Sequence, residues 1–390
     1  LLYDELNNPV NDCMKARELL YDEKARWNSL SPKRQKIFAS LLRDREEFVG
    51  FLTMMGAQGL YTDTEELADI IREEYDGKIC SNAEIRNLAI SQPCAMAYAL
   101  SLIDTTDRRS ITPGWVLHNF PEVEYVIRKL RHCRCEKGCR YCNESLDVGA
   151  ALKDNFGYDK CRSYNNEPLQ ENATRAAVDG KSLLAIFPTG GGKSLTFQLP
   201  ALMAGKAVHG LTVVISPLQS LMKDQVDNLR SKGIKAAAIY SGMSRQDIIA
   251  TLENCIFGDY KFLYVSPERL STDLFLVKLR AMNVCLLVVD ESHCISQWGY
   301  DFRPSYLKIA DIRNELPNIP VLALTATATK EVADDIQKKL KFKKKNIFRA
   351  SFVRKNISYV VRNTEDKIKE LIHIINSVKG TGIVYVRSRR

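Results

Sequence analysis

The sequence has no apolar run long enough to cross a membrane as a helix. The apolar run Val284–Val289 has the length of a strand, whereas a membrane helix needs about 20 residues. The first ten residues carry Asp4 and Glu5 and no basic region, so they do not form a secretion signal. We therefore expect no membrane partner. An initial Met is also missing, so we expect the chain to be a fragment or to have lost its start.

Low-complexity tracts and repeats of fixed period are absent as well, which excludes a fibrous or disordered chain. The 390 residues are 45% hydrophobic and 26% charged, typical of a globular protein with two to three domains. Lysine and arginine exceed aspartate and glutamate by 56 − 47 = 9 residues. This surplus is compatible with a polyanion partner, although many unrelated proteins are as basic.

Nothing in the cysteine pattern indicates disulfides. Eleven is an odd number of cysteines in a chain large enough to be stable without disulfides, so we expect a reducing, cytoplasmic location. Three of the cysteines lie near apolar stretches and are expected to be buried as small hydrophobic residues; they are Cys255, Cys285 and Cys294.

Four cysteines fall within ten residues: Cys133, Cys135, Cys139 and Cys142. Four thiols so close together, with Gly138 to turn the chain, predict a structural zinc site that holds a helical domain against the next domain. The spacing C-x-C-x₃-C-x₂-C differs from the common pair of C-x₂-C knuckles. An iron–sulfur cluster would use the same ligands, and uncoordinated thiols are a third possibility.

The pattern of apolar residues differs between the first and the later part of the chain. Up to about residue 132 it is helical: Ser31-Pro32 is a typical helix start, and Ser81 or Asn82 is expected to cap a later helix. From about Ser182, short apolar runs alternate with amphipathic stretches, which predicts βαβ units and a parallel sheet. The predicted strands are Leu183–Phe187, Val213–Ile215, Ala236–Tyr240, Phe262–Val265, Val284–Val289 and Val321–Leu324, and a second βαβ pattern is expected from Ile357–Val361, a helix at 366–376 and Ile383–Val386.

The most specific motif is Pro188-Thr189-Gly190-Gly191-Gly192-Lys193-Ser194, between an apolar strand and a helical stretch. Glycines let backbone N–H groups turn toward phosphates, and the following helix N-terminus adds partial positive charge. Lys193 is expected to reach the terminal phosphates of a nucleotide, and the Ser194 hydroxyl to bind Mg²⁺. The alternative is a glycine-rich turn without a ligand.

Two carboxylates follow the apolar strand Val284–Val289. Asp290 is placed to hold Mg²⁺ through water, and Glu291 to orient and deprotonate an attacking water. Acidic pairs end many strands, but this pair together with the glycine motif predicts nucleotide hydrolysis.

The segment Asp290–Pro304, DESHCISQWGYDFRP, resembles the DEAH box and aromatic-rich loop of RecQ-family DNA helicases, with Ser292 where the family usually has Ala. Further motifs resemble that family in the same order: Phe156-Gly157-Tyr158, Pro168-Leu169-Gln170, Ser216-Pro217-Leu218, Ser266–Leu270, Thr325–Thr329 and Ile383–Ser388. The resemblance implies an α/β fold. A RecA-like lobe with a parallel sheet would follow the mainly α-helical domain and its cysteine knuckle. The expected domains are 1–130 (helical), 131–154 (cysteine segment and linker), 155–350 (first lobe) and 351–390 (start of a truncated second lobe).

The resemblance also implies an ATP site. Gln170 would read the adenine edge, and Tyr158 would stack on the base with Arg162 nearby. Cys161 replaces the usual Phe, and an insertion around Tyr164–Glu167 lengthens the gap before Gln170. Tyr158 and Arg162 are therefore open to a second interpretation, as surface loop residues.

In the family the aromatic-rich loop couples DNA binding to hydrolysis. Aromatic faces stack on unpaired bases, and arginine pairs with phosphate. The residues expected to act in this coupling are Ser216, His293, Gln297, Trp298, Phe302, Arg303, Thr325 and Thr327. The alternative for Trp298 and Phe302 is a place in the core.

The resemblance implies an ATP-dependent DNA helicase that needs ATP, Mg²⁺ and single-stranded or tailed duplex DNA. The alternatives are a double-strand translocase, a module that binds ATP and DNA without turnover, and an RNA enzyme. The remaining C-terminal lobe is an expected partner, and without it we expect slow hydrolysis of bound Mg-ATP.

Overall fold

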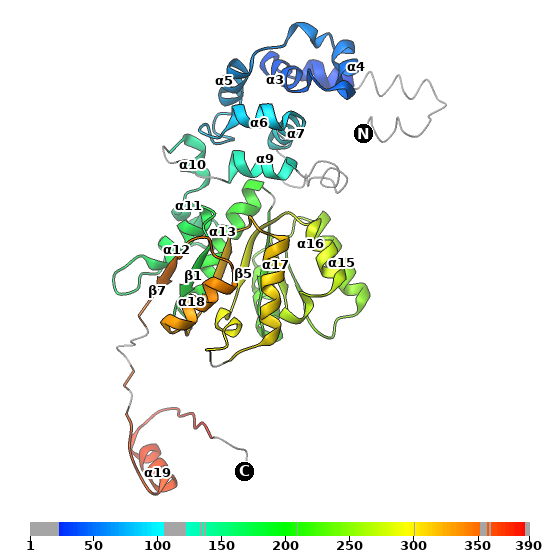
Figure 1. The fold of residues 1–390 in the computed structure, drawn as a ribbon. Helices are drawn as coiled ribbons and strands as arrows, with labels where there is room; N and C mark the ends of the chain where they lie inside the picture. Colours follow the sequence, from blue (N-terminus) through cyan, green and yellow to red (C-terminus); the bar gives the residue numbers. More distant parts are fainter. Residues whose placement is uncertain are drawn as a thin grey trace. The chain divides into compact units, whose positions relative to one another are not determined.

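The computed structural model describes residues 23–104, 122–132, 135, 138–208, 210–299, 301–351, 357–358 and 360–386. The chain divides into two compact units, Leu1–Ser351 and Phe352–Arg390, which Figure 1 colours from blue to red along the sequence. Among the described residues, no helix is both long and apolar enough to span a membrane.

The first part of the larger unit is helical. The α3 helix begins at Pro32 because the Ser31 hydroxyl accepts a hydrogen bond from the Arg34 N–H at 3.2 Å. The α6 helix begins at Ile85 without a side-chain cap, so the predicted cap at Ser81 or Asn82 is wrong. The helices are α3 (Pro32–Leu42), α4 (Glu46–Met54), α5 (Thr64–Glu74), α6 (Ile85–Ser91), α7 (Pro93–Asp104), α9 (Glu122–Arg131), α10 (Arg140–Ser145) and α11 (Val148–Phe156).

A seven-stranded, all-parallel sheet follows, in the order β3-β4-β2-β5-β6-β1-β7. The six strands predicted from apolar runs are confirmed. The short edge strand β7 was missed, because its three residues are largely exposed and carry no apolar run. The strands are β1 (Leu183–Ile186), β2 (Leu211–Ile215), β3 (Ala236–Ile239), β4 (Phe262–Val265), β5 (Val284–Val289), β6 (Val321–Thr325) and β7 (Ile347–Arg349).

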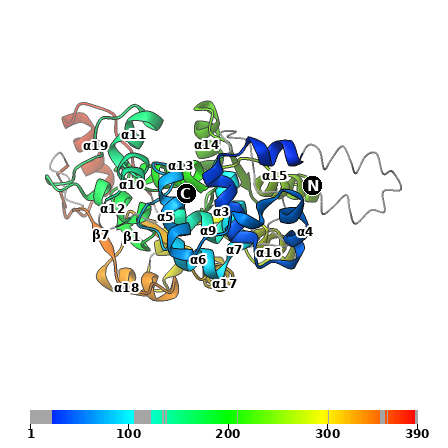
Figure 2. The ribbon, with the colours of Figure 1, turned by 90° about the horizontal axis from the view of Figure 1, so that it is seen from above.

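Helices cover both faces of the sheet, which explains why β1 to β6 are buried and almost entirely apolar. Along β1, Leu184 and Ile186 enter one buried cluster, and Leu183 and Ala185 enter the cluster on the opposite face. Figure 2 shows α14 on the side opposite α17 and α18. One face is covered by α15 (Arg245–Phe257), α16 (Asp273–Arg280), α17 (Ile309–Glu315) and α18 (Lys330–Lys339), the other by α12 (Leu169–Val178), α13 (Lys193–Val208) and α14 (Gln219–Ser231). The expected fold class, a parallel α/β lobe preceded by a mainly helical region, is confirmed.

The helical region is attached to the sheet through α13 and α9. Ala207 and Val208, at the end of α13, belong to the buried core of the helical region. Asn283, just before β5, donates to a Glu124 carboxylate oxygen at 2.6 Å and to the Val208 carbonyl at 2.9 Å. The side-chain oxygen of Asn283, Oδ1, accepts from Arg128 at 3.1 Å. The two parts therefore share both an apolar core and a polar junction.

The smaller unit contains α19 (Lys367–Ser377), which matches the predicted helix and begins with the Asp366 side chain as its cap. The two strands predicted beside it are wrong for this structure. The described residues from 357 to 361 and residues 383–386 are not strands, and Val361 and Tyr385 are each 91% exposed. A strand is stable only beside another strand that pairs its backbone groups.

The junction can be tested with Asn283→Ala, which removes three hydrogen bonds at a part-buried site. We expect the free energy of unfolding to fall by about 1–3 kcal/mol, the usual cost of breaking a buried polar network. Urea titration followed by circular dichroism measures it. Asn87→Ala, on the exposed face of α6, is the matched control. Equal effects of the two variants would show that the junction contributes nothing.

Candidate functional site

The glycine motif forms a loop between β1 and α13, at the carboxyl edge of the sheet. Gly190 and Gly192 have φ angles of 73° and 80°, a region that favours glycine. A side chain on Gly191 would place its Cβ 2.7 Å from the Pro188 carbonyl oxygen. The loop leads directly into Lys193, the first residue of α13, so the free N–H groups of that helix start face the loop. Thr189 lies exposed in the same loop. This geometry would suit a bound phosphate group, as the sequence predicted.

Three side chains from a segment upstream bind the carbonyl groups of this loop. Arg162 Nη1 donates to the Gly190 oxygen at 2.5 Å, and the Tyr164 hydroxyl donates to the Gly191 oxygen. Gln170 Nε2 donates to the Gly192 oxygen at 2.8 Å. Three consecutive carbonyls are therefore held outward, which leaves the N–H side of the loop for a ligand.

Gln170 is fully buried, and its amide oxygen also accepts from the Arg162 backbone N–H at 2.7 Å. The amide thus joins the Arg162 segment to the loop, and its predicted contact with adenine stays a prediction. Tyr158 lies just beyond the end of α11 with its side chain 56% exposed, so its predicted stacking on the base also stays a prediction.

Tyr164 is a residue that the sequence analysis missed. It begins a tight hairpin in which Asn165 and Asn166 have φ angles of 50° and 67°. The backbones of Tyr164 and Glu167 exchange hydrogen bonds of 2.9 Å in both directions. Asparagine tolerates this left-handed conformation, so Asn-Asn is a usable signal for such a turn. The turn places the Tyr164 ring against Phe187, with ring centroids 5.0 Å apart and planes at 23°.

The carboxylates lie beside the loop, because β5 and β1 are both neighbours of β6. The Lys193 ammonium is 3.7 Å from Glu291 Oε1. Burial, with the adjacent charge of Glu291, raises the pKa of Asp290 to about 6. Glu291 has a φ of 45°, which is uncommon for a side chain other than glycine and is a feature of functional sites. The arrangement brings the Lys193 ammonium, the part-buried Asp290 and the Glu291 carboxylate close together.

A polar chain continues from Glu291 to the end of β6. His293 Nδ1 is 3.3 Å from Glu291 Oε2 and 2.9 Å from the Thr325 hydroxyl. That hydroxyl donates its one proton to the Thr327 carbonyl, so His293 donates from Nδ1. Burial lowers the pKa of His293, which favours the neutral ring. The sequence-predicted residues Lys193, Glu291, His293 and Thr325 are thus brought into one network.

The aromatic-rich loop is exposed where the sequence predicted nucleic-acid contact. Trp298 is 78% exposed, so it is not a core residue, and Gln297 beside it is exposed too. Phe302 is half-buried under Lys339 of α18. Arg303 pairs with Asp301 at 3.1 Å. It also donates to the backbone carbonyl of Pro217, the residue after Ser216, at 3.5 Å. Ser216 itself is buried at the end of β2, so any effect it has on a ligand passes through its neighbours.

Cysteine residues form a separate cluster in the helical region. The sulfur atoms of Cys80, Cys135, Cys139 and Cys142 all lie within 4.8 Å of one another. Three of these residues were predicted from the sequence, and Cys80 was missed because it lies far upstream. The fourth predicted ligand, Cys133, lies outside the described residues.

Comparison with known proteins agrees with this geometry. Residues 167–336 match the model of the DEAD/DEAH box helicase family. The chain is 46% identical over 238 residues to ATP-dependent DNA helicase RecQ of Bacillus subtilis, covering 60% of this chain and 39% of that protein. It is 39% identical over 331 residues to ATP-dependent DNA helicase Q-like 4B of Arabidopsis thaliana, covering 82% of this chain and 25% of that protein.

A third relative is ATP-dependent helicase SGS1 of Saccharomyces cerevisiae, 40% identical over 231 residues, which cover 57% of this chain and 16% of that protein. The matched part of the chain is thus similar to helicases of the RecQ type. It spans less than half of the length of each of these relatives.

Tyr164→Phe tests the contact of the hairpin with the phosphate loop. The ring can still stack on Phe187, but the hydrogen bond to the Gly191 carbonyl is lost. One hydrogen bond contributes about 0.5–1.5 kcal/mol, so we expect ATP affinity to fall by about 2- to 12-fold. Titration with a fluorescent ATP analogue measures it, and Tyr260→Phe, between α15 and β4, is the control. Unchanged affinity would show that the hairpin does not position the loop.

Asp290→Asn tests the buried acid in nucleotide-free protein. Because its pKa is raised from 3.8 to about 6, the folded state binds more protons than the unfolded state between these values. Stability is therefore lost as the pH rises through this window, and the loss is complete above pH ~6. We expect Asp290→Asn to raise the Tm at pH 7.5, with the difference shrinking toward pH ~4. Thermal melts of Asp227→Asn, on the exposed face of α14, are the control. A lower Tm for Asp290→Asn at pH 7.5 would show that burying the ionised Asp290 carboxylate does not destabilise the folded protein.

Proposed function

We propose that the protein carrying this chain is an ATP-dependent DNA helicase, in which the parallel lobe binds and hydrolyses Mg-ATP. The observation that carries the proposal is the network from Lys193 through Glu291 and His293 to Thr325. It links the phosphate loop, the acidic pair and the end of β6 within a domain similar to helicases of the RecQ type. The name and activity of the relatives support the same function.

The roles of the residues follow from their chemistry. The Lys193 ammonium would move from Glu291 to the β- and γ-phosphates, since a phosphate carries more negative charge than one carboxylate. Glu291 would accept a proton from the attacking water, and His293 would hold the Glu291 carboxylate in place. Thr189, Gly190, Gly191 and Gly192 would wrap the phosphates, and Tyr158, Arg162 and Gln170 would face the base.

The donor set beside the loop suits Mg²⁺, which prefers hard oxygen ligands and keeps several of its waters. Ser194 offers a hydroxyl in the first turn of α13, and Asp290 offers a carboxylate at the end of β5. When bound, Mg²⁺ would neutralise charge on the transferring phosphate. Its presence would also offset the burial cost of an ionised Asp290.

We propose single-stranded DNA, alone or as the tail of a duplex, as the partner of the aromatic-rich loop. The exposed Trp298 offers a face for stacking on an unpaired base, and Arg303 offers a cation. Phe302 and Gln297 flank these contacts. The Arg303 contact with the Pro217 carbonyl connects the loop to Ser216, and His293 connects it to Thr325 and Thr327. Nucleotide state and DNA contact can therefore influence each other.

We also propose that the chain divides into a helical domain (1–130), a cysteine segment and linker (131–154), a first lobe (155–350) and the start of a second lobe (351–390). A structural zinc ion would be a further cofactor. The second lobe would be the partner that completes the ATP site. A cytoplasmic location would keep the cysteine thiols reduced.

The function is tested by strand separation with the intact protein that carries this sequence. We expect ATP-dependent unwinding of tailed duplex DNA, and none for Glu291→Gln, which lacks the base. ATP hydrolysis on blunt duplexes without any strand separation would instead indicate a double-strand translocase. Turnover stimulated by RNA and not by DNA would contradict the proposed substrate.

Trp298→Ala should weaken binding of single-stranded DNA while ATP binding stays unchanged. Stacking on an aromatic side chain contributes about 1–3 kcal/mol per base, so we expect affinity to fall by about 5- to 150-fold. Fluorescence anisotropy with a labelled oligonucleotide measures it. Phe257→Ala is the matched control, because Phe257 is 56% exposed at the end of α15, toward the opposite edge of the sheet. An equal loss in both variants would exclude a specific role for Trp298.

A further inference from the structure

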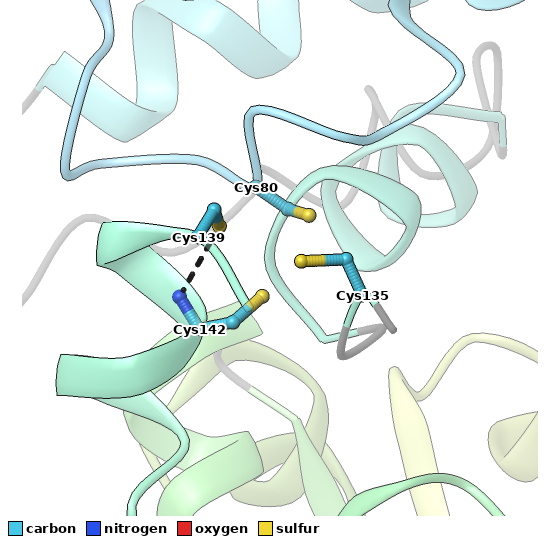
Figure 3. A group of neighbouring side chains, drawn as sticks. All are labelled: Cys80, Cys135, Cys139 and Cys142. Atoms are coloured by element: carbon cyan, nitrogen blue, oxygen red, sulfur yellow. Dashed lines mark hydrogen bonds between the residues drawn. The ribbon is translucent and has the colours of Figure 1, made fainter. Parts of the chain in front are cut away.

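We propose that Cys80, Cys135, Cys139 and Cys142 bind one zinc ion, and that Cys80 is the fourth ligand in place of Cys133. Figure 3 shows the four side chains converging on one point from separate parts of the helical region. Their sulfur atoms lie within 4.8 Å of one another. A tetrahedral zinc ion with Zn–S bonds of about 2.3 Å holds its sulfurs about 3.8 Å apart, so small side-chain shifts would complete the site.

The spacing of the sulfurs favours a single ion over an iron–sulfur cluster. In a cluster of several irons the thiolates bind different iron atoms around a core that also holds inorganic sulfide. Such a core keeps cysteine sulfurs on different irons farther apart than one shared ion does. All four sulfurs here are mutual neighbours, which fits a single tetrahedral ion.

The local backbone is built to present these thiols. Gly138, with a φ of 67°, turns the chain between Cys135 and Cys139. Cys139 is the N-cap of α10, and its sulfur accepts a hydrogen bond from the Cys142 backbone N–H at 3.5 Å. The helix start thus fixes the positions of Cys139, its N-cap, and of Cys142 in its first turn.

Cys80 is held in place by a different part of the chain. It lies in the connection between α5 and α6, and its backbone N–H donates to the Leu130 carbonyl near the end of α9 at 2.8 Å. Its side chain is 2% exposed. Two residues on, the Asn82 amide donates to the sulfur of Cys135 at 3.3 Å. The same short connection therefore supplies one ligand and a hydrogen bond to another.

A zinc ion at this point would join the α5–α6 connection to the turn before α10. Cys80 and Cys142 belong to a buried cluster that also contains Leu199 and Met203 of α13. The α13 helix begins with Lys193 of the phosphate loop. With four protein ligands and no open position, the ion would be structural and would fix the surface on which α13 packs.

The ligand set is tested by measuring zinc per chain in matched serine variants. We expect about one zinc in the unmodified chain, in Cys133→Ser and in Cys94→Ser, a cysteine outside the cluster. Cys80→Ser should lose zinc, or bind it at least tenfold more weakly in competition with a chromogenic chelator. Zinc kept by Cys80→Ser and lost by Cys133→Ser would overturn the assignment, as would a brown protein containing iron.

A second measurement covers the case in which Cys80→Ser does not fold. X-ray absorption of the unmodified zinc protein should give four sulfur ligands at about 2.3 Å. Alkylation before and after extraction of zinc should show that Cys80 becomes reactive together with Cys135, Cys139 and Cys142, and that the reactivity of Cys133 does not change. Protection of Cys133 with a reactive Cys80, or nitrogen or oxygen ligands, would contradict the proposal. These readouts do not involve ATP, so they stand apart from the proposed helicase function.

Discussion

The parallel alignment of β1, β6 and β5 is the constraint on which the candidate ATP site depends. Parallel neighbours all end at the same edge of a sheet, so the residues that follow these strands meet there. The glycine loop follows β1, the acidic pair follows β5, and Thr325 ends β6. The network from Lys193 to Thr325 therefore follows from the strand order, although its two ends lie 325 − 193 = 132 residues apart in the sequence.

Helix α13 carries this constraint into the helical region. Its first residue, Lys193, belongs to the phosphate loop, and its middle packs against the cluster that contains Cys80 and Cys142. Its last residues, Ala207 and Val208, enter the core of the helical region. One helix thus extends from the candidate ATP site, past the buried cluster that contains Cys80 and Cys142, to the helical core. Through α13, the position of the glycine loop is physically linked to the packing of the helical region.

Local sequence patterns predicted the strands and the segments that meet at the candidate site, but not the residues that join them from elsewhere in the chain. The glycine loop, the acidic pair and six strands are each defined by adjacent residues, so their patterns could be read directly. Cys80 joins the thiol cluster from another connection, and no spacing rule relates it to Cys135. Tyr164 was seen only as part of an insertion, because the turn that directs its ring to Phe187 depends on two asparagines with positive φ. The predicted strand at 383–386 has no described strand to pair with, so an apolar run alone could not determine its conformation.

Lys193 and Glu291 pair with each other at 3.7 Å, and we propose that both lie at one phosphate site. Isothermal titration with Mg-ATP tests it most directly on the unmodified chain, Lys193→Ala and Glu291→Gln. Lys193→Ala should bind Mg-ATP about 10- to 150-fold more weakly, because a hydrogen bond to a charged group contributes about 1.5–3 kcal/mol. Glu291→Gln should bind it at least as tightly as the unmodified chain, since the variant removes a negative charge and frees Lys193. If both variants bind Mg-ATP like the unmodified chain, the phosphate site lies elsewhere and the account is wrong.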